Sequence, residues 1–233
     1  LARYFSLIPA GDALARPYHV EPPQEGERTF IIEGEASPQI MLAYHKPNYP
    51  HPDDPAVSLL IEMLTGGGSA PLARTLVEQE AVALSVSASE GPGFAYPNLV
   101  QFFIVPKAPH APQMVLGRFD RALERALAGG LTSARLEIAK RWVARSYLKR
   151  LGGNMPIALD LAGSTLIYGD WRVALEWFDK AMAVELDEVK RVGKQYLKVS
   201  NRTVGMHSKA SLPRGGPPKE SGPEAPDGRE RKS

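Results

Sequence analysis

Histidine is the side chain that most often binds zinc and moves protons in catalysis, and this chain of 233 residues contains five histidines. None stands in H-x-x-E-H or H-E-x-x-H, the helical spacings that place two imidazoles on one metal ion. His45 and His51 are nearest to each other, on either side of a proline-rich loop, and no third ligand follows at a readable spacing. We interpret both as solvent-facing loop histidines in preference to a metal pair.

A run of three glycines and a serine, in GGGSAPLA, is the other stretch with a candidate chemical role. Gly66, Gly67, Gly68 and Ser69 lack the Lys-Ser/Thr ending of a phosphate loop, so they are weak evidence for nucleotide binding. A helix C-terminus with close backbone approach explains the glycines as well. No G-x-S-x-G nucleophile motif is present, and the absence of cysteine excludes thiolate chemistry and disulfides.

The acidic residues and the tryptophans show no paired site. We expect six acidic side chains to cap helices or to lie on solvated helix faces. They are Asp53, Asp54, Glu78, Glu80, Asp187 and Glu188. Trp142, Trp171 and Trp177 stand at core-like spacing in helical segments, and we expect them to be buried. The residues therefore indicate a folded domain without a self-contained active site.

The elements that hold these residues follow from the apolar periodicity. Two β-branched or apolar runs, Thr29 to Glu35 and Gln39 to His45, are split by GEASP and predict a pair of strands joined by a turn. Asp53 is a good helix N-cap, and the apolar face that follows it ends at Gly66. Ser69 with the proline after it predicts the start of a second helix.

The rest of the chain continues with strands and then helices. Leu84, Val86 and Ala88 alternate with serines, which is the period of a half-buried strand, and residues 98–107 predict another strand. Helical spacing then recurs between residues 114 and 197, with a cap at Thr132 or Ser133, and residues 202–208 predict a closing strand. This order predicts an α+β class, an antiparallel sheet with helices packed on one face.

Composition bounds the domain organisation and excludes some partners. We expect residues 1–28 to be the end of a preceding domain and a linker, residues 29–208 to be the folded domain, and residues 209–233 to be a disordered tail. The net charge is +2, all of which the tail supplies, so nothing favours a nucleic acid partner. No apolar run reaches the ~20 residues of a membrane span. The chain begins with Leu1, and we expect it to be a piece of a longer polypeptide.

The segment LLIEMLTGGGSAPLARTLVEQEAVALSVSAS, with IMLAYHKPNYPHPDDPA before it, YFSLIPAG near the start and T-x-x-R-L-E-I-A-K downstream, resembles the C-terminal domain of an M16-family zinc peptidase. This family includes insulinase, pitrilysin and the mitochondrial processing peptidase, and the resemblance is to the two-subunit bacterial type. It extends from about Arg3 to Ser208. The implied fold is an α+β, LuxS/MPP-like metallohydrolase half-domain.

The resemblance also implies where the chemistry lies. The upstream domain of the same polypeptide would carry H-x-x-E-H with a distal Glu, so zinc is expected in the parent protein, bound before residue 1, and no cofactor is expected on this chain. Gly66, Gly67, Gly68 and Ser69 become substrate-cleft candidates.

A departure from the family pattern concerns the strand that follows the glycines. Family members often read L-R-E-x-x-G-L-A-Y there, and the resemblance implies that the Arg and the Tyr hold the peptide backbone and the tetrahedral intermediate. Val77, Ala81 and Leu84 stand in place of the Arg, the Gly and the Tyr. Valine and leucine offer no hydrogen-bond donor to an oxyanion. The chain thus fits the back half of a zinc-carrying subunit whose homologous M16 partner supplies the Arg–Tyr pair.

Three functional hypotheses follow from different classes of protein. The leading one is a domain of a zinc endopeptidase that forms one wall of the peptide chamber and contacts a partner subunit, in a periplasmic or otherwise exported protein. The alternative is a non-catalytic scaffold subunit of the same fold, and the third is an unrelated binding module. An H-x-x-E-H upstream of Leu1 separates the first from the second.

Overall fold

The computed structural model describes residues 21–93 and 96–209, together with the isolated positions 6, 9 and 11. The predicted linker over residues 1–28 lies mainly outside these residues, and the predicted tail lies outside them from residue 210 onward. Within the described part of the chain, no helix has the length and the apolar character needed to cross a membrane.

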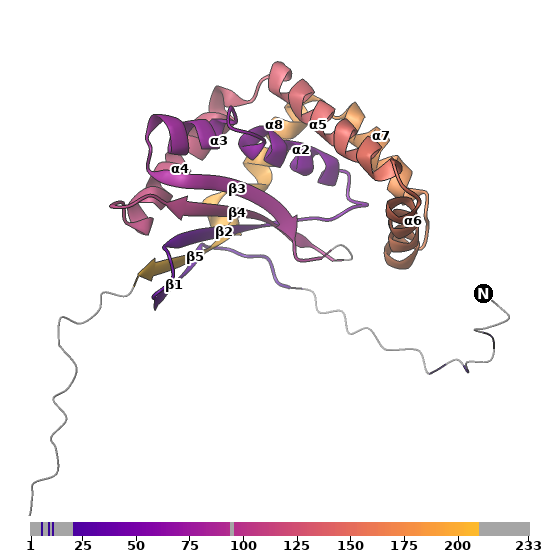
Figure 1. Cartoon of the computed structure of the whole chain (residues 1–233), viewed down its shortest axis with the longest axis horizontal. Helices are drawn as coiled ribbons and strands as arrows, with labels where there is room; N and C mark the ends of the chain where they lie inside the picture. The colour runs from indigo at the N-terminus through magenta and orange to yellow at the C-terminus, as the bar shows by residue number, and fades with distance from the viewer. Residues whose placement is uncertain (1–5, 7–8, 10, 12–20, 94–95, 210–233) are drawn as a thin grey trace, which may run out of the picture.

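Five strands form one sheet in the order β1-β5-β2-β4-β3. They are β1 (Arg28–Gly34), β2 (Gln39–Lys46), β3 (Ala83–Gly91), β4 (Asn98–Pro106) and β5 (Arg202–Lys209). β2 pairs antiparallel with both β4 and β5, β3 pairs antiparallel with β4, and β1 pairs parallel with β5. Helices cover one face of this sheet, as Figure 1 shows, so the predicted α+β class is confirmed. The sheet is mixed and not wholly antiparallel as predicted, because β1 runs parallel to β5.

The first two strands do not pair with each other, so the predicted hairpin is wrong. β5 lies between them, and its Gly205 is opposite Phe30 of β1 on one side and Met41 of β2 on the other. β5 buries Val204 and Met206, whereas no residue of β1 is fully buried. β5 therefore takes the interior position although β1 has the more apolar sequence, and Phe30, Ile31 and Ile32 of the edge strand β1 stay more than half exposed.

The helical layer begins with α2 (Asp54–Thr65), which lies over the sheet in Figure 1. The helical segments that follow are α3 (Pro71–Ala73), the π-helical η1 (Arg74–Gln79), α4 (Pro112–Arg125), the π-helical η2 (Ala126–Gly130), α5 (Ser133–Leu151), α6 (Asn154–Tyr168), α7 (Val173–Ala183), α8 (Leu186–Tyr196) and the short 3₁₀ helix η3 (Val199–Asn201). In Figure 1, α6 stands at one end of this layer, away from the sheet.

The core lies between the sheet and α2. Alternate residues of β2 and β4 point into it, among them Leu42, Tyr44 and Phe102, each at most 1% exposed. Phe119 of α4 packs edge-on against Phe102, with 5.2 Å between the ring centroids. Such aromatic pairs add about 0.5–1.5 kcal/mol beyond the burial of their surface. This core holds the first turns of α2 in a fixed position beside the ends of β2 and β3.

Two of the predicted helix starts need correction. Thr132 caps α5 as predicted, because its hydroxyl accepts a hydrogen bond from the Arg135 amide. Ser69 does not cap the next helix, since Ala70 occupies the N-cap position. Asp53 does occupy the N-cap of α2, but its side chain forms no capping hydrogen bond. Its carboxylate instead bonds to α8, which is a stronger interaction than a cap because the partner is charged.

Leu84 faces solvent, contrary to the alternation predicted for β3. Its exposed fraction is 60%, whereas Val86 is buried and the serines of the strand are exposed as predicted. The register of β3 against β4 shifts between Ala83 and Ser85. A bulge inserts one residue and turns the side chain at that point away from the face that simple alternation assigns.

Two of the three tryptophans are not in the core. Trp142 is 55% exposed and Trp171 is 42% exposed, whereas Trp177 is half-buried and packs against the core. Trp142 faces a cavity between helices, and Trp171 lies in a shallow depression beside α6. Trp142 lies in α5 and Trp177 in α7, as predicted, whereas Trp171 lies in the turn before α7 and not in a helix.

Candidate functional site

A cavity of about 970 Å³ opens between α2 and β3 on one side and α5, α6 and α7 on the other. One face of α2, from Asp54 to Glu62, and the end of β3 form its floor, and α5, α6 and α7 form the opposite walls. Its volume lies at the upper end of the range of small-molecule sites. The chemistry of the cavity therefore depends on the polar groups at its floor.

A buried ion cluster forms that floor. The Lys46 ammonium donates to Asp54 Oδ1 at 2.6 Å and also to Glu90 Oε2, and the side chain of Lys46 is fully buried. Ser58 Oγ of α2 donates to Glu90 Oε1 at 2.6 Å. Burial opposes the charge on Lys46, but the two carboxylates outweigh it and raise its pKa above the ordinary value. One ammonium thus serves two carboxylates, which leaves the cluster one negative charge in excess.

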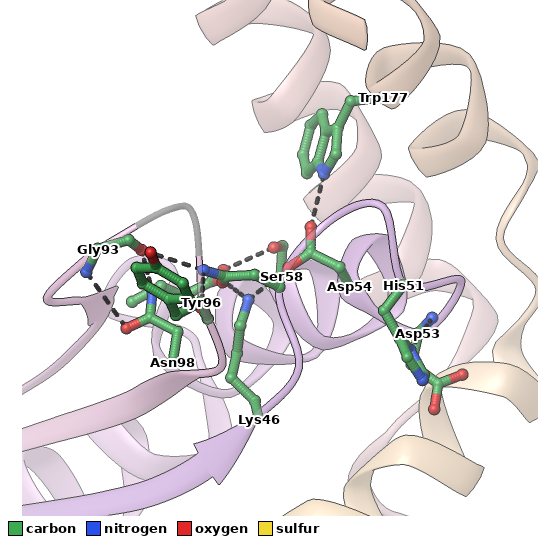
Figure 2. Close-up of polar contacts among 11 residues, drawn as sticks. Lys46, His51, Asp53, Asp54, Ser58, Gly93, Tyr96, Asn98 and Trp177 are labelled. Atoms are coloured by element: carbon green, nitrogen blue, oxygen red, sulfur yellow. Dashed lines mark hydrogen bonds and ion pairs between the residues drawn. The ribbon is translucent and has the colours of Figure 1, made fainter. Parts of the chain in front are cut away.

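Trp177 completes the cluster from the helical side. Its indole N–H donates to Asp54 Oδ2 at 2.9 Å, so both oxygens of Asp54 are bonded, as Figure 2 shows. Asp54 is 6% exposed, which corrects its predicted role as a solvated neighbour of the helix cap. Unpaired, a buried carboxylate would cost several kcal/mol, on the order of 3–5 kcal/mol. These bonds therefore join β2, α2 and α7 at one point.

Asp53 lies in a second polar cluster outside the cavity. Its carboxylate points away from that of Asp54 (Figure 2) and accepts hydrogen bonds from both guanidinium nitrogens of Arg191 and, at 2.7 Å, from the Tyr196 hydroxyl. The bonds from Arg191 hold the pKa of Asp53 below its ordinary value. Burial, with the bond to Asp53, raises the pKa of Tyr196. This cluster ties α8 to the start of α2.

One face of α2 lines the cavity with Ser58, Ile61 and Glu62. Their spacing of i, i+3 and i+4 is that of H-x-x-E-H, but a hydroxyl, an alkyl group and one carboxylate do not fit zinc. Burial raises the pKa of Glu62 above its ordinary value. Among the residues that the structure describes, no group of three or more His, Cys, Asp or Glu side chains could hold a metal ion.

The other acidic residues singled out in the sequence lie outside the cavity. Glu80 is half-buried and pairs with Arg125 at 3.2 Å. The prediction that Glu80 lies on a solvated helix face is therefore wrong. Asp187 is exposed, and Glu188 accepts from the Glu185 amide in a capping box, as expected at a helix start. Glu78 is exposed on η1 as predicted.

The predicted loop histidines have local structural roles. His51 is exposed, and its Nδ1 accepts a hydrogen bond from the Asp53 amide at 3.1 Å. His45 is half-buried rather than solvent-facing, because it is the penultimate residue of β2, and its Nε2 lies 3.1 Å from Gln24 Oε1. Neither histidine lines the cavity.

The glycine run lies between α2 and α3 and does not line the cavity. A Cβ added at Gly66 would lie 2.4 Å from the Glu62 carbonyl oxygen and 1.9 Å from Glu62 Oε1, so Gly66 has to be glycine for Glu62 to keep its place. Gly67 has a φ of 81°, which favours glycine. Gly68 and Ser69 are exposed. These glycines end the helix and leave room for the Glu62 side chain at the cavity floor.

Val77 and Leu84, where the sequence resemblance leads us to expect an Arg and a Tyr, lie in different environments. Val77 packs against the core, and Leu84 is exposed on the bulge of β3. Neither residue lines the cavity.

The sequence reasoning missed the ion cluster, although a signal was present. Lys46 continues the inward-facing series of β2 after Ile40, Leu42 and Tyr44, so alternation alone places its side chain inside. A buried lysine requires a carboxylate partner. The partners, Asp54 and Glu90, are 8 and 44 residues away, and only the fold brings them to it.

The chain is similar to proteins of one peptidase family. The model of the family described as the peptidase M16 inactive domain matches residues 1–142. A zinc protease, PqqE, from Helicobacter pylori is 24% identical over 199 residues, which is 82% of this chain and 43% of that protein. A solved protease from Helicobacter pylori superposes with a TM-score of 0.77 at 20% identity, covering 85% of this chain and 48% of that one.

A peptidase M16 inactive domain from Pseudomonas fluorescens superposes with a TM-score of 0.74 at 20% identity, over 90% of this chain and 49% of that one. At identities this low, the superpositions show a common fold. The chain spans about half the length of these relatives.

Proposed function

We propose, because the chain belongs to the peptidase M16 inactive-domain family, that it is the C-terminal, non-metal-binding domain of a zinc metalloendopeptidase subunit. In that role it forms one wall of a peptide-binding chamber and contacts a partner subunit. The match to the family model carries this proposal. The cavity supports it, since a hollow of about 970 Å³ lined by apolar side chains and a few polar groups suits a peptide.

Zinc belongs, in this proposal, to the domain upstream of residue 1 in the same polypeptide. The donors for the oxyanion belong to a homologous M16 partner that carries an Arg–Tyr pair. The environments of Val77 and Leu84 support this division, because an alkyl side chain packed on the core and another on a solvated bulge offer no donor to a substrate.

We further propose the boundaries and the location that accompany this role. Residues 29–208 are the domain, the residues before them are the end of the preceding domain and a linker, and the tail follows. Export to the periplasm is the proposed location.

Reconstitution of the parent protein tests the proposal. The full-length subunit should bind one zinc ion and hydrolyse peptides only when mixed with a partner that carries the Arg–Tyr pair, whereas residues 1–233 alone should bind no stoichiometric zinc and cleave nothing. Metal analysis and a peptide-cleavage assay give the two readouts. Full activity of the lone subunit would contradict the two-chain model, and a full-length subunit without zinc would favour the scaffold alternative.

A further inference from the structure

The cavity floor carries a net negative charge. Asp54, Glu90 and Glu62 contribute three carboxylates, and within the described part of the chain Lys46 contributes the only ammonium bonded to any of them. Among the described residues, the Glu62 carboxylate has no ion-pair partner within 4.0 Å, and Glu90 keeps 29% of its side-chain surface exposed. A cation that enters the cavity would therefore meet two carboxylates in excess.

The cationic side chains of the cavity lie on its rim, at the end of α5. Arg150 is already paired with Asp160 of α6 at 3.6 Å, and Lys149 is exposed. The rim therefore carries one positive charge in excess, and the floor carries the negative excess. This arrangement directs a ligand with an internal cation toward the floor.

The walls of the cavity are apolar and aromatic, and they are uncovered. Leu159 of α6 is 65% exposed and Trp142 of α5 is 55% exposed, and both line the cavity. α6 has Asp160 as its only ionisable acidic or basic residue, and none of its residues is buried. A helix that is apolar around its circumference is normally covered on more than one side. Aromatic faces beside carboxylates also suit the stem and the head of a basic side chain.

One edge of the cavity offers backbone hydrogen-bonding groups. β3 is the last strand of the sheet, and within the described residues no strand pairs with its outer edge. Ala88, Ser89 and Glu90, at the end of β3, line the cavity, and the first two of these side chains are small. An open strand edge with small side chains accommodates an extended peptide backbone.

We propose that this cavity binds an extended peptide segment and places one basic side chain, Arg or Lys, between Glu90 and Glu62, with the flanking apolar side chains against α6. The assignment of a peptide rests on the proposed function. The assignment of a basic side chain rests on the charge and the aromatic walls of the cavity. The cavity thus selects which part of a peptide lies across this domain, without taking part in bond cleavage.

Binding of two matched peptides to residues 1–233 tests this inference. One is a ten-residue, end-blocked peptide of leucine, alanine and serine with one central arginine, and the other has glutamine in place of the arginine. Titration followed by calorimetry, with the fluorescence of Trp142 and Trp177 as a second signal, should show the arginine peptide bound about tenfold more tightly. Raising the salt concentration should reduce this preference.

Matched variants locate the site. Glu62→Gln and Glu90→Gln should each lower the preference for arginine about 3- to 10-fold and leave the glutamine peptide unaffected, whereas Glu137→Gln, on the exposed face of α5 outside the cavity, should change neither. Glu62 has no ion pair, so its variant keeps the test valid if Glu90→Gln fails to fold. Leu159→Ser should weaken both peptides, and Leu166→Ser, which is exposed on α6 outside the cavity, should weaken neither.

The inference would be overturned by equal affinity for the two peptides, by no binding of either at millimolar concentration, or by equal effects of Glu62→Gln and Glu137→Gln. A dimer that both Leu159→Ser and Leu166→Ser dissociate would also overturn it, since the surface would then join two copies of the chain. These readouts are independent of cleavage. If the full-length protein hydrolyses peptides while residues 1–233 show no preference for arginine, the proposed function stands and the inference fails. If residues 1–233 bind the arginine peptide selectively but the full-length protein cleaves no peptide, the inference stands and the proposed function fails.

Discussion

At the scale of single residues, Asp53 and Asp54 show how position alone leaves a role undecided. The two carboxylates are adjacent in the sequence and both are 6% exposed, yet one bonds to Arg191 of α8 and the other to Lys46 of β2 and Trp177 of α7. Successive residues at the start of a helix point about 100° apart, so they reach different neighbours. The start of α2 is thereby fixed from two sides.

The shift of the Asp53 pKa predicts a dependence of stability on pH. Because Arg191 lowers the pKa of Asp53 in the folded state, the ionised carboxylate stabilises the fold above its unfolded pKa of about 3.9, and this contribution is lost as the pH falls through the lower folded value. Asp53→Asn should lower the free energy of unfolding by about 1–3 kcal/mol at pH 7 and by progressively less below about pH 4. Urea unfolding at several pH values measures this difference.

The control for this prediction is Asp187→Asn, because the side chain of Asp187 is 93% exposed. That substitution should change the free energy of unfolding by less than about 0.5 kcal/mol. A loss at Asp53 that stayed constant from pH 7 to pH 3 would contradict the role of its charge.

Ala81 carries backbone strain at a position where the sequence resemblance leads us to expect glycine. Its φ is 49°, a left-handed conformation that costs a residue with a Cβ roughly 1–2 kcal/mol. Ala81→Gly should relieve this strain and, after the greater flexibility of glycine in the unfolded chain is subtracted, stabilise the protein by about 0.5–1 kcal/mol. Thermal unfolding checks the gain, and Ala81→Val should destabilise in the same assay. Destabilisation by glycine would show that the left-handed conformation is not strained here.

At the scale of elements, the segment from η1 to β3 shows where periodicity fails. The short helix buries Leu72 and Leu76 as its spacing predicts, and the strand then bulges and exposes Leu84. A bulge depends on the partner strand, because it is the register against β4 that shifts. No pattern within β3 itself reveals it.

Truncation of two leucines in neighbouring elements should lower the free energy of unfolding by very different amounts. Leu84→Ala should lower the free energy of unfolding by less than about 0.5 kcal/mol, because the side chain is 60% exposed. Leu76→Ala should cost about 2–5 kcal/mol, because that side chain is 0% exposed and its removal leaves a cavity. Chemical denaturation of the two variants compares them directly. Similar losses for both would mean that Leu84 is buried.

At the scale of the whole molecule, the closing strand holds the sheet together. β5 lies between β1 and β2, and its first residue, Arg202, is 4% exposed. The Arg202 guanidinium donates to Asp120 of α4 at 3.0 Å and to the Tyr44 hydroxyl of β2 at 3.2 Å. Burial raises the pKa of Tyr44 to about 12, so this hydroxyl stays protonated. The last strand thus connects the sheet edge, the sheet centre and a helix.

This topology predicts different outcomes for two truncations. Deletion of residues 202–233 should leave a chain that does not fold, because it removes an interior strand and opens both β1 and β2. Deletion of residues 210–233 should leave the melting temperature unchanged, since the composition of that segment predicts no packed structure. Circular dichroism and thermal unfolding distinguish the two. A cooperative transition in the shorter chain would show that β5 is dispensable.

The sequence by itself determined the α+β class, the order of the elements, the buried faces of α2 and β4, and the family. Each of these depends on local periodicity, on caps such as Thr132, or on a motif read along the chain. The tertiary structure alone decided that β5 separates β1 from β2, that Leu84 and Trp142 are exposed, and that Lys46 is paired with Asp54 and Glu90. Strand order, register shifts and buried ion pairs depend on contacts between residues far apart in the chain. These contacts contribute to stability only when the fold brings the residues together, so no local pattern predicts them.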